Sequence, residues 1–189
     1  MRWFTRRWHG GPMSEARVDS VRDDYARHIA ELRAHLPKPL SVFVREKDYV
    51  SMHDGHFISV QAPATVSRRL IFDIACWDMA RGTLADNRWS YPDLHVRIVY
   101  DGAELLTPKT LETLERRTRN AKTVILYDEF DRAPHGKAFE HRMLLWPPEA
   151  GFVAVRFSQA NVSVVRFEGA KATILRSAPL ASHVRNVPG

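Results

Sequence analysis

The chain has little cysteine and no long apolar stretch. Cys76 is the single cysteine among the 189 residues, so no disulfide can form within the chain. It lies in an alternating apolar run and is expected to be a small buried residue of a protein in a reducing compartment, the cytoplasm. No apolar run approaches the roughly 20 residues of a membrane-spanning helix, and no apolar segment follows Arg2, Arg6 and Arg7 before Gly10. The sequence therefore predicts neither a membrane span nor a secretory signal.

The sequence also lacks the short motifs that identify common enzymes. It contains no G-x-x-x-x-G-K-[ST] phosphate loop, no G-x-G-x-x-G, no H-E-x-x-H, no C-x-x-C and no G-x-S-x-G. Residues from distant strands can still form an active site, so this absence does not exclude an enzyme. It favours a binding protein, and no cofactor is expected.

The composition is that of a globular protein with a basic N-terminal part. Apolar residues make up 44% and charged residues 26% of the chain, which has a formal net charge of +6. Residues 1–45 contain nine Lys and Arg against five Asp and Glu, a balance of +4, and the remaining residues contain nineteen against seventeen, a balance of +2. This bias is compatible with an acidic protein, nucleic acid or anionic lipid as partner and does not choose among them.

The most regular pattern predicts a long amphipathic helix from Ser14 to Leu36. Ser14 is suited to the N-cap, and Pro37 and Pro39 prevent the helix from continuing. Apolar residues follow one another in steps of three and four, which places them on one helix face. They are Val18, Val21, Tyr25, Ile29, Leu32 and Leu36. Leu40, Phe43 and Val44 also have helical spacing, but that run is too short to decide.

The rest of the chain is dominated by alternating, β-branched and aromatic segments that predict strands. These are 57–61, 69–77, 94–100, 123–130, 138–146, 152–157 and 162–167, with a weaker one at 172–175. Residues 131–137, with Pro134 and Gly136, are typical of a hairpin loop, and Trp146-Pro147-Pro148 of a rigid turn that ends a strand. Thr107-Pro108 predicts the start of a short crossover helix over 107–118.

Together these segments predict an α+β fold, in which the N-terminal helix packs on a mostly antiparallel sheet of about seven strands. The expected organisation is a basic and aromatic segment over 1–12, a single domain over 13–176 and an irregular tail over 177–189. Unpaired sheet edges would allow a homodimer.

His53-Asp54-Gly55-His56 is the first candidate site. Imidazole and carboxylate groups bind divalent transition metals, and two histidines three residues apart can meet at a turn. The simpler interpretation is a turn before a strand, in which Gly55 takes a positive φ and His53 packs at the edge of the sheet.

A second candidate site consists of polar residues on the two strands that flank the 131–137 loop. They are Asp128, Glu129, Glu140, His141 and Arg142. A carboxylate pair beside a histidine and an arginine could transfer protons or hold a ligand. The simpler interpretation is a network of cross-strand charges on one solvated face of the sheet.

The N-terminal segment alternates basic and aromatic side chains, namely Arg2, Trp3, Phe4, Arg6, Arg7 and Trp8. Such a segment can stack on single-stranded bases or lie at an anionic membrane surface. The favoured interpretation is that the aromatic residues dock on the sheet while the arginines reach solvent.

Several of these segments resemble an uncharacterised family of small bacterial proteins of unknown function. The resemblance spans roughly residues 1–167 and depends on 1–5, Leu36-Pro37, 51–55, 127–129, 139–147 and 155–157. Because the family has no assigned activity, it implies none here. The His-Asp segment that opens a sheet is also similar to that of some immunity proteins of bacterial toxin systems, and this likeness implies binding to a partner protein.

Three hypotheses follow. The leading one is a non-catalytic, immunity-like protein-binding domain that uses the polar hairpin together with His53 and Asp54. The second is a nucleic-acid-binding protein that uses the N-terminal arginines and tryptophans. The third is a metal-dependent or acid–base enzyme at His53, Asp54 and His56, with His141 as a further candidate.

Overall fold

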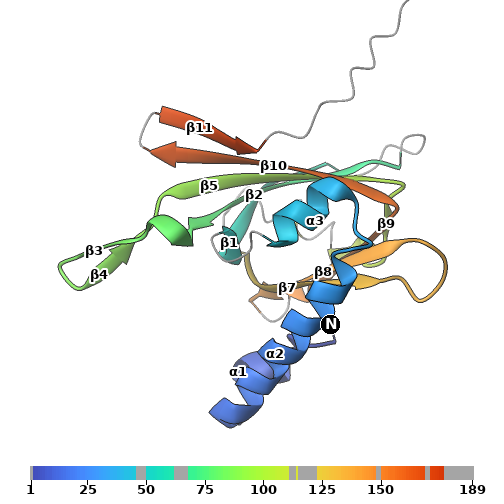
Figure 1. Ribbon diagram of the computed structural model, residues 1–189, viewed down its shortest axis with the longest axis horizontal. Helices are drawn as coiled ribbons and strands as arrows, with labels where there is room; N and C mark the ends of the chain where they lie inside the picture. The colour runs from blue at the N-terminus through green and yellow to red at the C-terminus, as the bar shows by residue number, and fades with distance from the viewer. Residues whose placement is uncertain are drawn as a thin grey trace, which may run out of the picture.

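A computed structural model describes residues 2–45, 50–61, 68–110, 114, 123–147, 150–168 and 171–176. Its N-terminal part is helical, with α1 (Arg6–Gly10), α2 (Glu15–Leu32) and α3 (Lys38–Arg45), as Figure 1 shows. Helix α2 begins after Ser14, as predicted, but ends four residues earlier than the apolar stripe, at Leu32. A tight turn then leads to Pro37, and the undecided run after it forms α3.

The predicted α+β fold with a mostly antiparallel sheet is confirmed. The strands are β1 (Val50–Gln61), β2 (Leu70–Asp78), β3 (Thr83–Ala85), β4 (Arg88–Ser90), β5 (Asp93–Asp101), β6 (Glu104–Leu105), β7 (Val124–Arg132), β8 (Phe139–Trp146), β9 (Phe152–Phe157), β10 (Gln159–Glu168) and β11 (Lys171–Arg176). Within the described residues the main sheet has nine strands in the order β11-β10-β5-β2-β1-β7-β8-β9-β6, while β3 and β4 pair separately. About seven strands were expected because the two-residue β6 has no recognisable pattern and the segment that forms β11 has only a weak one.

The main sheet closes on itself at a corner between two long strands. Strand β5 runs on into β6 through Gly102, and β9 runs on into β10 through Ser158. Asp101 pairs with Gln159 and Glu104 with Arg156, so the two residues between these pairs on one strand match two on the other across the corner. Because β10 pairs with β5 and β9 pairs with β6, the two sides of the sheet meet as one bent pair of antiparallel strands.

Side chains that alternate along the strands fill the inside of this closed sheet. Leu70, Phe72 and Ile74 on β2 face Tyr100, Ile98 and Val96 on β5, and all six are fully buried. This is the alternating apolar face that the sequence predicted for the 69–77 and 94–100 segments, Cys76 included. Helix α3 packs against β10 and adds Leu40 and Phe43 to the same core.

Two predicted segments lie partly or wholly outside the described residues. The crossover helix begins at Pro108, as predicted from the Thr107-Pro108 pair, and Leu114 is helical, but 111–113 and 115–122 are not described. The predicted tail, 177–189, lies outside the described residues as well. Among the helices that are described, none is long and apolar enough to cross a membrane.

The corner that closes the sheet should be sensitive to an added methyl group. Gly102 has a φ of +63°, and a Cβ atom there would collide with the Ser158 hydroxyl. Gly136, in the loop between β7 and β8, has a φ of +81° with open space around it. We expect Gly136→Ala to lower the free energy of unfolding by about 1 kcal/mol through backbone strain alone. Gly102→Ala should cost about 1–3 kcal/mol more.

Chemical denaturation of the two variants in parallel measures this difference, because both replace a glycine of positive φ by the same residue. Equal destabilisation of the two variants would contradict tight packing at the corner.

Candidate functional site

Strand β1 pairs with only a short part of one edge of β7, and side chains supply the hydrogen bonds along the rest of the described edge. Strand β1 pairs with β7 only through Gly55 with Ile125 and His56 with Val124. Beyond that point the Phe130 amide donates to the Tyr25 hydroxyl at 2.9 Å, and the Phe130 carbonyl lies 3.2 Å from Nε2 of His28. Two side chains of α2 therefore take the place that a further strand would occupy.

His53 completes the same edge. Its Nδ1 is hydrogen-bonded to the Leu126 carbonyl, and its ring stacks on Tyr127 with ring centroids 5.0 Å apart. The expected packing of His53 at the edge of the sheet is therefore observed. The expected turn before a strand is wrong, because residues 53–56 lie inside β1, where the register with β2 shifts between Ser51 and His56.

The positive φ expected at Gly55 is found instead at Asp54, at 59°. Gly55 is needed for a different reason, because a Cβ atom there would crowd the backbone carbonyls of Met52 and Ala75. The segment is thus an irregular, bulged part of a strand. Across the described part of the chain no group of three or more His, Cys, Asp or Glu side chains could hold a metal ion.

The polar residues of β7 and β8 do not share one solvated face, as the simpler interpretation expected. Asp128 and His141 point into the closed sheet, whereas Glu129, Glu140 and Arg142 lie on its outer side. The alternation of side chains along a strand requires this division, because neighbours in sequence point to opposite faces. The structure thus separates the predicted cluster into an inner and an outer network.

The inner network joins His141 to Asp128 and to Tyr100. The Tyr100 hydroxyl lies 2.6 Å from Nδ1 of His141, and Nε2 of His141 lies 3.2 Å from the Asp128 carboxylate. The His141 ring also stacks on Phe130, with centroids 3.9 Å apart. Burial, together with the negative charge of Asp128, raises the pKa of Tyr100 well above its ordinary value.

The order hydroxyl, imidazole and carboxylate is that of a nucleophile activated by a base. Tyr100 and His141 are nonetheless fully buried, so a substrate has no access to the hydroxyl in this structure. The network therefore fixes the strands across the interior. Tyr100 could not be predicted as a partner of His141, because β5 and β8 are not neighbours in the sheet and meet only when it closes.

The outer network ties the N-terminal segment to the sheet. The buried Glu129 carboxylate accepts hydrogen bonds from the backbone amides of Arg2 and Trp3, the second at 3.0 Å. Glu140, also buried, is hydrogen-bonded to Arg142 and, at 2.9 Å, to Arg156. Burial opposes the ionisation of Glu140, but hydrogen bonds from Arg156 and Arg142 outweigh it and lower the pKa of this carboxyl group.

The favoured docking of the N-terminal aromatic residues on the sheet is observed for Phe4, whose ring stacks on Tyr127 of β7 with centroids 5.4 Å apart, whereas Trp3 packs on helix α2. Phe4 is buried and packs edge-on against Tyr25, and the Trp3 ring lies 4.3 Å from the ring of His28. The expectation that the arginines reach solvent is wrong for Arg6, which donates to the Leu145 and Gly151 carbonyls at 2.9 and 3.0 Å. Arg2 and Arg7 are exposed, and the side chain of Trp8 lies outside the described part of the structure.

A further buried carboxylate, not predicted from the sequence, lies on the outer side of β2. Asp73 accepts two hydrogen bonds from Arg97, at 2.7 and 3.0 Å, and one from Ser59 at 2.6 Å. Burial raises its pKa, but these partners outweigh burial and leave the pKa lowered. Two charged residues and a serine on three separate strands form no recognisable pattern in the sequence.

Among the described residues, the two most exposed large apolar side chains lie on a hairpin that was not predicted from the sequence. Strands β3 and β4 project from the body of the protein (Figure 1), and Leu84 pairs across them with Trp89. These two side chains are 58% and 60% exposed. Asp86 and Asn87 form the two-residue turn with φ values of 50° and 58°, the geometry of a type I′ turn. The Asp-Asn pair was the available signal.

The aromatic side chains of this hairpin pack closely against Gly82. Trp89 and Tyr91 are nearly parallel, with centroids 6.0 Å apart, and a Cβ atom on Gly82 would collide with the Tyr91 ring. At the base of the hairpin, Arg81, Tyr91 and Phe167 line a hollow of about 310 Å³. A protruding apolar pair thus stands beside a recess.

Comparisons of the chain with family models, with curated proteins and with solved structures find no significant match. The functional interpretation therefore depends on the geometry of the described residues.

The inner network makes a testable contribution to stability. Tyr100→Phe leaves Nδ1 of the buried His141 without its hydroxyl partner, so we expect the free energy of unfolding to fall by about 1–3 kcal/mol. Tyr91→Phe, in the hairpin, removes the same atom from a half-buried ring and is the control. Urea denaturation measures both variants. A Tyr100→Phe protein as stable as the control would show that the network contributes nothing.

The outer network should make stability depend on pH. Because the pKa of Glu140 is lower in the folded protein than its ordinary value of 4.5, its contribution is present above that value and lost as the pH falls through the folded pKa. Glu140→Gln should therefore be less stable than the original protein at neutral pH, and the difference should shrink in acid. Glu104→Gln removes an exposed carboxylate from the same Arg156 and should change stability by less than about 1 kcal/mol.

Denaturation midpoints of both variants between neutral and acidic pH provide the comparison. A pH profile of Glu140→Gln parallel to that of the original protein would contradict this assignment.

Proposed function

We propose that this protein is a non-catalytic protein-binding domain whose contact surface is the β3–β4 hairpin. The observation that supports this proposal best is the cross-strand pair of Leu84 and Trp89, each more than half exposed on a projecting hairpin. Tryptophan is enriched among the residues that dominate binding energy in protein interfaces. A second exposed apolar side chain directly opposite it makes an anchor that a partner's pocket can enclose.

The hairpin is also built to keep its shape. The type I′ turn at Asp86-Asn87 matches the twist of paired strands, and the Trp89 and Tyr91 rings stack above Gly82. A contact surface that is ordered before binding loses little conformational entropy in the complex. The recess beside Phe167 gives the partner a second point of contact.

The burial of the polar residues on β7 and β8, which were expected at the binding surface, supports a structural role for them. Asp128, Glu129, Glu140 and His141 are buried and hydrogen-bonded within the chain. His53, likewise, is bonded to the backbone of β7. These residues stabilise the sheet from which the β3–β4 hairpin projects. The β3–β4 hairpin is the part that contacts the partner.

The partner that fits is an acidic protein with an apolar pocket. A formal net charge of +6 accelerates encounter with a negatively charged protein, while burial of Leu84 and Trp89 supplies affinity. The immunity-like role is one form of this proposal, in which the partner is a toxin that the complex neutralises. The cytoplasm is the proposed location.

Affinity capture with matched variants tests the proposal. Tagged protein is incubated with extract of its native cells, with and without nuclease treatment, and retained proteins are quantified by mass spectrometry. We expect one acidic protein near equal amount, reduced at least tenfold by Trp89→Ser and by Gly82→Ala, which displaces the aromatic rings. Ile58→Ser removes another exposed apolar side chain, 49% exposed on β1, and should leave capture unchanged.

Three outcomes would contradict the hairpin as the contact surface. One is undiminished capture by Trp89→Ser, and another is equal loss with Ile58→Ser. The third is a complex that disappears on nuclease treatment, because it would indicate nucleic acid as the bridging partner. Circular dichroism of each variant shows whether the fold is intact.

A further inference from the structure

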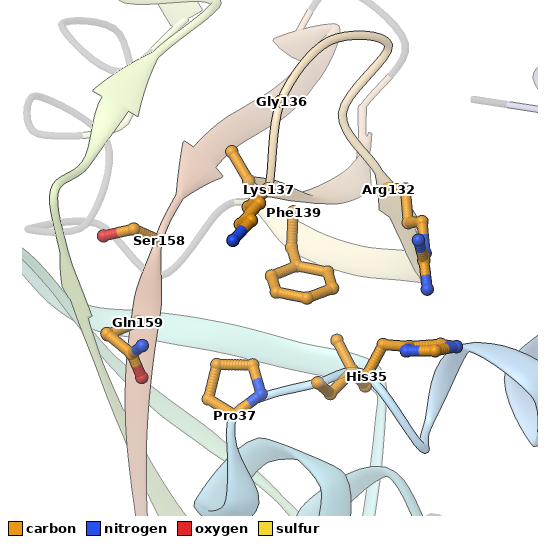
Figure 2. A pocket seen from close by; sticks show the side chains of 10 residues that line it. His35, Pro37, Arg132, Gly136, Lys137, Phe139, Ser158 and Gln159 are labelled. Carbon is orange, nitrogen blue, oxygen red and sulfur yellow. The ribbon is translucent and has the colours of Figure 1, made fainter.

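A pocket of about 370 Å³ lies at the corner where the sheet closes, away from the proposed contact surface. Three parts of the chain meet there: the turn between α2 and α3, the loop between β7 and β8, and the corner between β9 and β10 (Figure 2). Each of these three parts contributes side chains to its lining. This volume is at the lower end of the range for small-molecule sites.

The charged groups in this lining have one sign. Arg132 and Lys137 are cationic, and none of the described Asp or Glu residues lines the pocket. Figure 2 shows the Lys137 amine pointing into the space beside the Phe139 ring, with Arg132 and His35 on another side. A neighbouring hollow that shares His35 and Arg132 is lined by Glu31 and Asp131 as well, so the two adjacent hollows differ in the charge of their linings.

The remaining lining supplies both an apolar wall and a neutral hydrogen-bonding group. The Phe139 ring, Leu36 and Pro37 form the apolar part, and Gln159 adds an amide, whereas the Ser158 hydroxyl donates to the Asp101 carbonyl. Helix α3 begins directly after Pro37 with Lys38 and has no acidic residue in its first turn. The partial positive charge of this helix start is thus not balanced by a carboxylate from its own first turn.

We propose that this pocket binds a small organic anion, in which a phosphate or carboxylate group is attached to a compact apolar group such as a single ring. The anionic group pairs with Lys137 and Arg132, since a guanidinium group can donate two parallel hydrogen bonds to either oxyanion. The apolar group lies against Phe139 and Pro37. A bare inorganic ion uses only the first of these contacts, and a neutral ring uses only the second.

Titration of the whole protein with four probes tests both parts of the proposal. The probes are phenyl phosphate, benzoate, inorganic phosphate and benzyl alcohol, followed through backbone amide shifts by NMR. We expect phenyl phosphate or benzoate to bind at least about tenfold more tightly than inorganic phosphate and benzyl alcohol, with shifts centred on residues 135–139 and 158–159. The better of the two ring anions identifies the anionic group. Affinity should fall as salt is raised, because the cationic side chains are exposed.

Charge-removing variants separate a built site from general attraction to a basic protein. Lys137→Gln should weaken binding of the better ring anion about tenfold. Arg88→Gln, in the β3–β4 hairpin, removes the same charge elsewhere and should leave the affinity unchanged. Equal weakening by both variants, shifts centred outside the pocket, or inorganic phosphate binding as tightly as the ring anions would overturn the proposal. Loss of protein capture by Trp89→Ser has no bearing on this result, so the two proposals can fail separately.

Discussion

The closure of the sheet between Gly102 and Ser158 is the constraint on which the other features depend. There the Ser158 amide and hydroxyl both donate to the Asp101 carbonyl, at 3.2 and 3.1 Å, while the chain turns from one side of the sheet to the other. Only a residue without a Cβ atom leaves room for the Ser158 hydroxyl at position 102. In an open sheet of the same strands, the inner side chains of β5 and β8 would not pack against one another.

Closure places polar groups in the interior, and these must find partners inside the protein. His141 and Asp128 do so with Tyr100 from the opposite side, so closure and the inner network require each other. On the outer side the same requirement is met by the N-terminal segment. The amides of Arg2 and Trp3 bind Glu129, and Tyr25 and His28 of α2 complete the edge of β7. The basic and aromatic start of the chain is thereby part of the fold.

The sequence predicts this fold well wherever one face of an element is apolar. The stripe from Val18 to Leu32 and the alternation in 69–77 and 94–100 each report burial directly, so α2, β2 and β5 were found. Prediction failed where pairing depends on residues far apart in the chain. The positions of Asp128 and Glu129 on opposite faces follow from strand alternation and could have been deduced, but Tyr100 as the partner of His141 could not, because it requires the closed sheet.

The β3–β4 hairpin was missed for the opposite reason, since all six of its strand residues are exposed and no buried face marks it. Apolar residues that a hydrophobicity pattern would assign to a core, such as Leu84 and Trp89, are at the surface there. A method that recognises elements by a buried apolar face therefore does not detect the β3–β4 hairpin, in which exposed apolar side chains indicate a partner.

The two proposed sites lie at opposite ends of the same pair of strands. The hairpin adjoins Asp93 at the start of β5, where Phe167 of β10 pairs with it, and the pocket adjoins the other end, where Asp101 pairs with Gln159. At about 3.3 Å per residue, the eight steps from Asp93 to Asp101 separate these ends by about 26 Å.

At that distance, a small anion in the pocket cannot touch a partner bound to the hairpin. Any effect of one on the other would have to pass through the β5–β10 ladder, whose nine paired residues are continuous and in unbroken register. A rigid ladder of this kind favours independent sites, because coupling requires an element with two arrangements.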